Sequence, residues 1–145
     1  MSITRNNPNT VFLGGNRVQI GDIAAKEVIT PGHLVERINT AGVTQWRKHA
    51  TAAADCSRAV ATDQSMLNKG VDDTYAINDL MEVSILEPGA NAWMLLPSGQ
   101  TIVYGDGLES NGDGQLRKLA SGVLLFKALE AKTTTAVTRI RVETV

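Results

Sequence analysis

The sequence has almost no cysteine and few aromatic residues. Its one cysteine, Cys56, excludes a disulfide within the chain, so stability must come from a packed core or from association. Aromatic residues make up 4% of the 145 residues, but hydrophobic residues together make up 43%. A chain of this length and composition can bury a core without covalent cross-links. Intrinsic disorder is therefore excluded, and the length is that of one domain.

An excess of charge of one sign is also lacking. Lys and Arg number 14 and Asp and Glu 15, for a formal net charge of −1. This balance gives no general attraction to nucleic acid or to an anionic membrane, and neither is expected as a partner. No apolar run approaches the ~18 residues of a membrane span, and the start, MSITRNNPNT, has no apolar signal-peptide region. We expect a soluble protein made in a cytoplasm.

Signatures of a metal site or of catalysis are missing as well. His33 and His49 are far apart in the sequence, and Cys56 has no CxxC partner, so we expect no metal. There is no GxSxG nucleophile elbow and no GxxxxGK[ST] phosphate loop. The turn ESNGDG at 109–114 has the oxygen ligands of a calcium loop, but its twelfth position falls on Ala120 instead of Glu. A hairpin turn is the better interpretation. No catalytic residue and no cofactor are expected.

What the sequence does contain is a series of short strand patterns. In RIRVET, Ile140 and Val142 alternate with polar residues, which is typical of a strand with one wet face. Turn residues recur between such runs, and Pro31-Gly32 and Pro88-Gly89 each predict a hairpin. The sequence therefore predicts an all-β fold, a small β-barrel or β-sandwich of short antiparallel strands.

Two segments fall outside this pattern. The alanine-rich segment favours a strand at 57–62 followed by a loop; the alternative is a short helix at 63–68 with Asp63 as its N-cap, so the chain has at most one short helix. Residues 1–9 carry polar turn formers and Pro8, and they are typical of an extended N-terminal arm. Residues 10–145 are expected to form a single β domain.

The stretch KGVDDTYAIND at 69–79 has the polar residues of a possible active site. Its glycine, with Asp72 and Tyr75 three residues apart, resembles the nucleoside pocket of trimeric dUTP-hydrolysing enzymes. In those enzymes an aspartate activates water and a glycine-rich C-terminal arm closes over the phosphates. Here Gly70 stands two residues before Asp72, whereas those enzymes have a separation of three. The sequence also ends in TRIRVETV, without glycine. We therefore favour the other interpretation, in which Gly70 and the aspartates form a turn and the aspartates bind nearby backbone donors.

Two tryptophans leave a further alternative open. Trp46 lies beside Arg47-Lys48-His49 and could stack on a base or a sugar, and Trp93 lies within an apolar run. An exposed tryptophan would suit a module that binds a carbohydrate or a host surface. A ring packed inward, in the core or at a subunit contact, is the favoured interpretation of both.

From residue 70 onward, several features follow one another in a definite order. Glycine and aspartates lead to a tyrosine, and then come a Pro-Gly turn, a GDxL turn, a DG turn, an Ala-Leu-Glu strand and a terminal Ile-x-Val strand. They are Gly70, Asp72, Asp73 and Tyr75; Pro88 and Gly89; Gly105, Asp106 and Leu108; Asp113 and Gly114; Ala128, Leu129 and Glu130; and Ile140 with Val142. This series resembles the head decoration, or cement, proteins of tailed bacteriophages, although residues 44–56 have no counterpart there.

The resemblance implies a non-enzymatic protein that binds the outer surface of an expanded bacteriophage capsid and stabilises it. It implies the major capsid protein as partner, assembly as a homotrimer first and a dimer second, and synthesis in the host bacterial cytoplasm. The arm has no core to join, so its residues are the predicted capsid contacts: Thr4, Arg5, Asn6 and Asn7. Tyr75 and Trp46 are the predicted contacts between copies.

Overall fold

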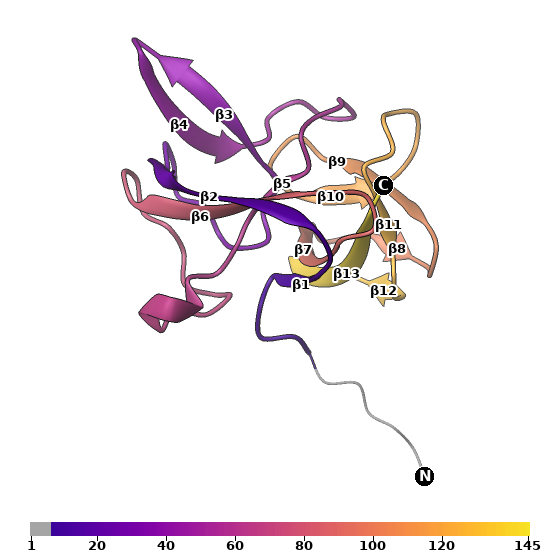
Figure 1. Ribbon diagram of the computed structural model, residues 1–145. Coiled ribbons are helices and arrows are strands. Elements are labelled where there is room, and N and C mark those ends of the chain that lie inside the picture. Colours follow the sequence, from indigo (N-terminus) through magenta and orange to yellow (C-terminus); the bar gives the residue numbers. More distant parts are fainter. Residues whose placement is uncertain (1–6) are drawn as a thin grey trace.

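The computed structural model describes residues 7–145, and in this range the chain forms β-strands and one 3₁₀ turn but no α-helix (Figure 1). The all-β prediction is confirmed. The elements are β1 (Phe12–Gly14), β2 (Arg17–Ala24), β3 (Val35–Thr40), β4 (Val43–Lys48), β5 (Ala59–Ala61), η1 (Ser65–Leu67), β6 (Leu80–Leu86), β7 (Asn91–Leu96), β8 (Thr101–Ile102), β9 (Gly107–Ser110), β10 (Leu116–Lys118), β11 (Phe126–Ala128), β12 (Lys132–Thr133) and β13 (Thr138–Thr144).

The strands form small antiparallel sheets that do not close into a barrel. One sheet has the order β1-β7-β13-β11-β9-β10, and the short pair β12-β8 lies beside it. A second sheet has the order β2-β6-β5, and β3 and β4 form a separate pair. We refer to β2–β6 as the N-terminal part and to β1 with β7–β13 as the C-terminal part. Of the two predicted architectures, the arrangement is that of a small β-sandwich.

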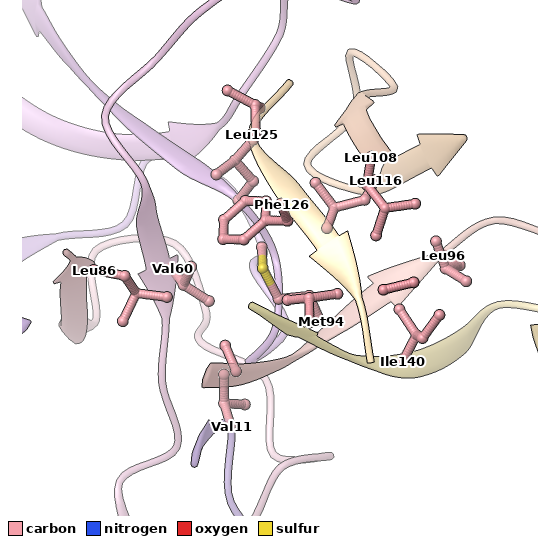
Figure 2. Close-up of a cluster of buried hydrophobic side chains, with 14 of the residues drawn as sticks. Val11, Val60, Leu86, Met94, Leu96, Leu108, Leu116, Leu125, Phe126 and Ile140 are labelled. Carbon is pink, nitrogen blue, oxygen red and sulfur yellow. The ribbon is translucent and has the colours of Figure 1, made fainter. Parts of the chain in front are cut away.

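The six-stranded sheet is held by the pairing of β7 with β13. Register runs from Thr138 opposite Leu96 to Glu143 opposite Asn91. Along β13 the buried residues alternate with half-buried ones, as the period-2 pattern of RIRVET predicts. The inner face of this sheet forms the larger of two apolar cores, in which side chains from several strands converge around Phe126 (Figure 2).

The smaller core lies in the N-terminal part, between the β2-β6-β5 sheet and the β3-β4 pair. It contains the bulky side chain of Trp46 together with Tyr75 and Met81. Strand β5 separates the two cores, because Val60 belongs to the larger core while its neighbours Ala59 and Ala61 belong to the smaller. Strand β5 is therefore buried on both faces, and its alanines are small enough to let Trp46 approach the sheet.

A hairpin that the sequence patterns do not predict extends from the N-terminal part (Figure 1). It joins β3 to β4 through Ala41 and Gly42, which have φ angles of 51° and 84°. Positive φ at both central residues is the geometry of a type I′ turn, which matches the twist of the two strands. The signal is weak in the sequence because alanine stands where asparagine or aspartate is usual.

The two predicted Pro-Gly hairpins are wrong, although both turns are present. Residues 87–90 lead from β6, which pairs with β2 and β5, to β7, which pairs with β1 and β13. At Pro31-Gly32, the flanking residue Ile29 bridges to Tyr75 instead of to the strand that follows the turn. Proline and glycine specify a local reversal of the chain, but they do not specify which strand pairs next.

The alanine-rich segment contains a strand, as favoured, and also a short helical turn. Strand β5 falls within the predicted 57–62, and η1 within 63–68. Asp63 is not the N-cap of η1, since Gln64 occupies that position. Asp63 instead accepts hydrogen bonds from the hydroxyl of Thr10 and the backbone N–H of Val11, both at 2.9 Å. The carboxylate of Asp63 thus binds residues more than fifty positions earlier in the sequence and does not cap the helical turn beside it.

Candidate functional site

The stretch 69–79 consists of turns whose aspartates serve the fold. Oδ1 of Asp72 accepts a 2.9 Å hydrogen bond from Arg139 on β13. The second terminal nitrogen of this guanidinium donates to the backbone carbonyl groups of Pro31 and Val71. Arg139 thereby ties two loops of the N-terminal part to the six-stranded sheet. Asp72 is paired with this cation and is not placed as a free base that activates water.

The remaining residues of the stretch are also used locally. Oδ2 of Asp73 accepts from the N–H of Gly70 at 2.7 Å, and Oδ2 of Asp79 accepts from the N–H of Ala76 at 2.8 Å. The prediction that aspartates here bind nearby backbone donors is confirmed for Asp73 but is wrong for Asp72, whose partner is the distant side chain of Arg139. The hydroxyl of Tyr75 donates to the carbonyl oxygen of Thr62. Burial raises the pKa of Tyr75 to about 12, so its hydroxyl remains protonated at neutral pH.

The side chains of Tyr75 and Trp46 are placed inside the chain's own smaller core. Tyr75 is 3% exposed and Trp46 is 1% exposed. Their contact with a second copy stays a prediction, but neither offers an open ring face. Trp93 is half-buried, and the guanidinium carbon of Arg139 lies 5.2 Å from its ring centre. Ring surface for stacking on a sugar or a base is thus limited at both tryptophans.

His33 lies at the junction of the two parts. Its Nδ1 accepts a 3.0 Å hydrogen bond from the N–H of Thr30, next to the loop that Arg139 holds. Burial, with a further contribution from the charge of Lys48, lowers the pKa of His33 to about 4. His33 is therefore neutral at physiological pH and acts as a hydrogen-bond acceptor that fixes this turn.

His49 and Cys56 both line a cavity of about 270 Å³ beneath the β3-β4 hairpin. Nδ1 of His49 lies 2.7 Å from the hydroxyl oxygen of Ser110, and its Nε2 lies 3.8 Å from Oε2 of Glu36. Burial raises the pKa of the Cys56 thiol to about 11, so the thiol is protonated at neutral pH. In residues 7–145 no group of three or more candidate ligands could hold a metal ion.

The acidic turn at 109–114 is the hairpin turn that the sequence predicts, between β9 and β10. Glu109 is fully buried, and its Oε2 lies 3.7 Å from Nη2 of Arg117 on the facing strand. Its Oε1 accepts a 2.7 Å hydrogen bond from the N–H of Ala120. The carboxylate is therefore used to hold the loop that follows β10, where a calcium site would need it free.

A second cavity, of about 320 Å³, was not predicted from the sequence; we name it the arm-root cavity because Thr10, the residue that follows the predicted arm, lines it. Asp63, in its wall, holds Thr10 and Val11 as described above. Arg17 stacks 3.9 Å from the ring centre of Phe12, and Gln19 donates to Glu82 at 2.8 Å. The lining residues are Thr10, Phe12, Arg17, Gln19, Thr62, Asp63, Gln64, Ser65, Met66, Leu67 and Glu82.

Exposed apolar side chains stand beside this cavity. None of the residues of η1 is buried, and Met66 is 98% and Leu67 65% exposed. Leu80 is 59% exposed, and its carbonyl oxygen accepts a hydrogen bond from the side chain of Gln64. We call Met66, Leu67 and Leu80 the apolar rim. The sequence signal for it is the pair Met-Leu within the polar loop TDQSMLNKG.

The predicted capsid contacts lie at the edge of the described range. Thr4, Arg5 and Asn6 fall outside the described residues, and Asn7 is exposed. From Thr10 onward the chain is bound to the domain, and Val11 is buried in the larger core. No helix in residues 7–145 is long and apolar enough to cross a membrane.

No protein-family model matches the sequence, and no curated protein matches it. Among solved structures, the chain is similar to the N base of head fiber gp8.5 of bacteriophage phi29, with a TM-score of 0.56. The likeness covers 90% of this chain and 98% of that chain, at 13% sequence identity. It therefore extends over nearly the whole of both chains, and at this identity it establishes the fold.

Proposed function

We propose that this chain is a non-enzymatic structural protein of a bacteriophage virion, and that it binds the outer surface of the expanded capsid and stabilises it. The observation that carries the proposal is the shared fold with a head fiber base, a component of a phage head, over nearly the whole of both chains. The order of turns from residue 70 onward supports the same class of protein independently of the fold.

The hydrogen bonds and pKa values of the polar residues also support a non-enzymatic role. Asp72 is paired with Arg139, the Cys56 thiol has its pKa raised to about 11, and His33 accepts a backbone hydrogen bond. Asp72 and His33 are thus bonded within the fold, and Cys56 packs against the larger core. A structural protein needs a rigid scaffold and a contact surface, and both can be built without a catalytic constellation.

The partner we propose is the major capsid protein in its expanded state. A protein that binds one state of the shell and not the other stabilises the bound state by mass action. We propose a homotrimer first and a dimer second, because symmetric association multiplies weak contacts and avidity then makes attachment strong. The near-neutral charge of −1 limits repulsion between many copies on one shell.

The arm residues Thr4, Arg5, Asn6 and Asn7 are the proposed capsid contacts. Deleting residues 1–9 leaves Thr10, which anchors the chain to Asp63, in place. We expect the truncated protein to fold as the full chain does and to attach more weakly. Unchanged attachment would remove the arm from the contact.

The test of the function is co-sedimentation with expanded, undecorated heads of the parent phage and with unexpanded proheads. We expect saturable binding to the expanded heads alone, with a copy number that identifies the symmetry site. Absence of binding to either particle, combined with dUTP hydrolysis that Asp72→Asn abolishes, would replace this proposal with the nucleotide-hydrolase alternative. Quenching of tryptophan fluorescence by a glycan would instead favour the carbohydrate-binding alternative.

A further inference from the structure

Strand β2 forms a free edge of its sheet and is the longest strand that the structure describes. In the described part of the chain only β6 pairs with it, because β2 is the first strand in the order β2-β6-β5. A free edge presents backbone N–H and C=O groups that can pair with another chain, and proteins usually protect such an edge with proline or lysine. Strand β2 has neither residue, and most of it is exposed.

The backbone groups that face away from β6 belong to Arg17 and Gln19. The N–H of Glu87 donates to the carbonyl oxygen of Asn16 at 3.1 Å, at the end of the β2-β6 ladder. In an antiparallel pair every second residue bonds to the same neighbour, so the even-numbered residues of this segment bond to β6. The N–H and C=O groups of Arg17 and Gln19 therefore point outward. A bulge after Ile20 interrupts the ladder, which limits the regular edge to residues 17–20.

The side chains of this edge alternate between apolar and polar. Ile20 packs against the smaller core, and Val18, two residues earlier, lies on the same face and is 53% exposed. Arg17 and Gln19 lie on the opposite face, where they donate hydrogen bonds to side chains of β6. Asp22, in the bulge, is exposed and adds a negative charge. An occupant that fits this edge is an extended segment with apolar residues on one face and an acidic residue near Arg17.

Strand β2 of a second copy meets each of these requirements. When two copies of β2 pair antiparallel about a two-fold axis at Gln19, Val18 of each copy lies opposite Ile20 of the other. Arg17 of each copy then lies close to Asp22 of the other, so opposite charges meet at both ends of the contact. The edge is thus complementary to itself in its apolar pattern and in its charge.

We infer that the free edge of β2 joins two copies of this chain, so that their β2-β6-β5 sheets form one continuous sheet across a two-fold axis. This inference rests on the proposed function only in that copies associate, and it names the contact for the dimer. A trimer would need two different surfaces on each copy. Only about four residues of each copy pair, so the dimer is weak by itself and gains strength where many copies lie on one shell.

The first test is sedimentation equilibrium of the full chain over a range of concentrations, and we expect a monomer–dimer equilibrium for the wild type. Val18→Lys brings like charges together near the two-fold axis. Val43→Lys is the matched control, because Val43 also lies in a strand of the N-terminal part and is 57% exposed. We expect Val18→Lys to weaken dimerisation at least about tenfold, and Val43→Lys to stay within about twofold of the wild type. Circular dichroism checks that both variants keep the fold.

A charge exchange tests the pairing of Arg17 with Asp22 between copies. Asp22→Arg alone and Arg17→Glu alone each place like charges together at both ends of the contact, so each variant should be mostly monomeric. In an equimolar mixture of the two variants, every pair across the contact again joins opposite charges. We expect dimers to return with an affinity within about threefold of the wild type. A defect in the fold of one chain would persist in the mixture, so recovery is specific to a contact between copies.

The outcomes separate the inference from the function. A wild type that stays monomeric at every concentration would overturn the inference, as would a dimer or trimer that Val18→Lys leaves unchanged. Single charge variants that do not recover in the mixture would overturn the proposed pairing. Saturable binding to expanded heads alongside any of these results would leave the proposed function in place. Dimerisation through β2 without binding to heads would overturn the function and leave the dimer contact.

Discussion

The two parts of the molecule use their apolar residues differently. In the C-terminal part, β7 and β13 bury alternate residues against the larger core, and polar groups such as Glu109 are held inside by specific partners. In the N-terminal part, most of β2 is exposed, η1 buries nothing, and the β3-β4 hairpin extends from the body. The C-terminal part is thus a packed scaffold, and the N-terminal part leaves more of its strand and turn residues exposed.

Specific contacts join the two parts. Arg139 joins β13 to two loops of the N-terminal part, and β5 contributes to both cores. The N-terminal part is therefore held against the scaffold by these contacts. Substitutions in the larger core, at the junction of the two parts and in the exposed η1 turn show what each region contributes to stability.

The largest expected effect is in the larger core. Phe126 is fully buried, so Phe126→Ala should lower the free energy of unfolding by about 3–5 kcal/mol, from lost burial and from the cavity left behind. Urea denaturation followed by circular dichroism measures it. A loss below about 1 kcal/mol would mean that Phe126 does not occupy the centre shown in Figure 2.

The same denaturation tests whether residues 10–145 unfold as one domain. In a Trp93→Phe background, fluorescence reports the smaller core through Trp46. We expect its midpoint to coincide with that of circular dichroism. Two separate midpoints would show that the N-terminal part unfolds alone.

The next effect is at the junction and depends on pH. The pKa of His33 is about 4 in the folded chain, against an ordinary value of 6.5, so protonation favours the unfolded chain. Its contribution to stability is complete above about pH 6.5 and is lost as the pH falls toward 4, by at most about 3 kcal/mol. His33→Asn retains an acceptor for Thr30 without titrating, and its stability should fall less steeply over this window. Parallel pH profiles for the two proteins would contradict the assignment.

A further test at the junction is Arg139→Gln. We expect a loss of about 2–3 kcal/mol, because the carbonyl groups of Pro31 and Val71 lose a charged donor. Asp72→Asn is the control; Asp72 is 88% exposed, so this pair should contribute less than about 1 kcal/mol. Thermal denaturation of both variants measures the difference. Equal losses would mean that the ion pair, and not the backbone contacts, holds the junction.

A smaller effect is expected at Tyr75. Tyr75→Phe keeps the ring in the smaller core but removes the hydroxyl that donates to Thr62, which should cost about 1–2 kcal/mol. If Tyr75 instead has its main role in a subunit contact, the variant will change the oligomeric state at unchanged stability of the chain. Urea denaturation with sedimentation equilibrium distinguishes the two results.

The smallest effect on stability is expected at the exposed η1 turn. Met66→Gln with Leu67→Gln should change the free energy of unfolding by no more than about 0.5 kcal/mol, because neither side chain is buried. A larger loss, measured by the same denaturation, would show that η1 contributes to the fold and would weaken the distinction between the two parts.

Local patterns predicted the strands well and their partners poorly. The alternation in RIRVET predicted which residues of β13 are buried, and the turn ESNGDG predicted the β9-β10 hairpin, because both are properties of neighbouring residues. The turns at Pro31 and Pro88 were taken for hairpins because turn chemistry does not encode the next pairing. The β3-β4 hairpin was missed because Ala41 is an unusual residue for its turn.

The candidate site was predicted only in part, for a related reason. Spacing within 69–79 predicted Asx-type turns, but the pairing of Asp72 with Arg139 joins residues far apart in the chain. The arm-root cavity likewise combines Thr10, β2, η1 and β6, and no sequence window contains all of these. Burial of Trp46 was favoured from the sequence, whereas the exposure of Met66 became evident only in three dimensions.

The most direct test of the difference between the two parts is hydrogen exchange of the protein, free and bound to expanded heads. We predict that binding slows exchange at residues 9–12 and 62–67, and leaves the exposed turn at 103–106 unchanged. Slower exchange confined to 103–106 and the neighbouring β12, with no change at 62–67, would place the contact on the C-terminal part and contradict the account.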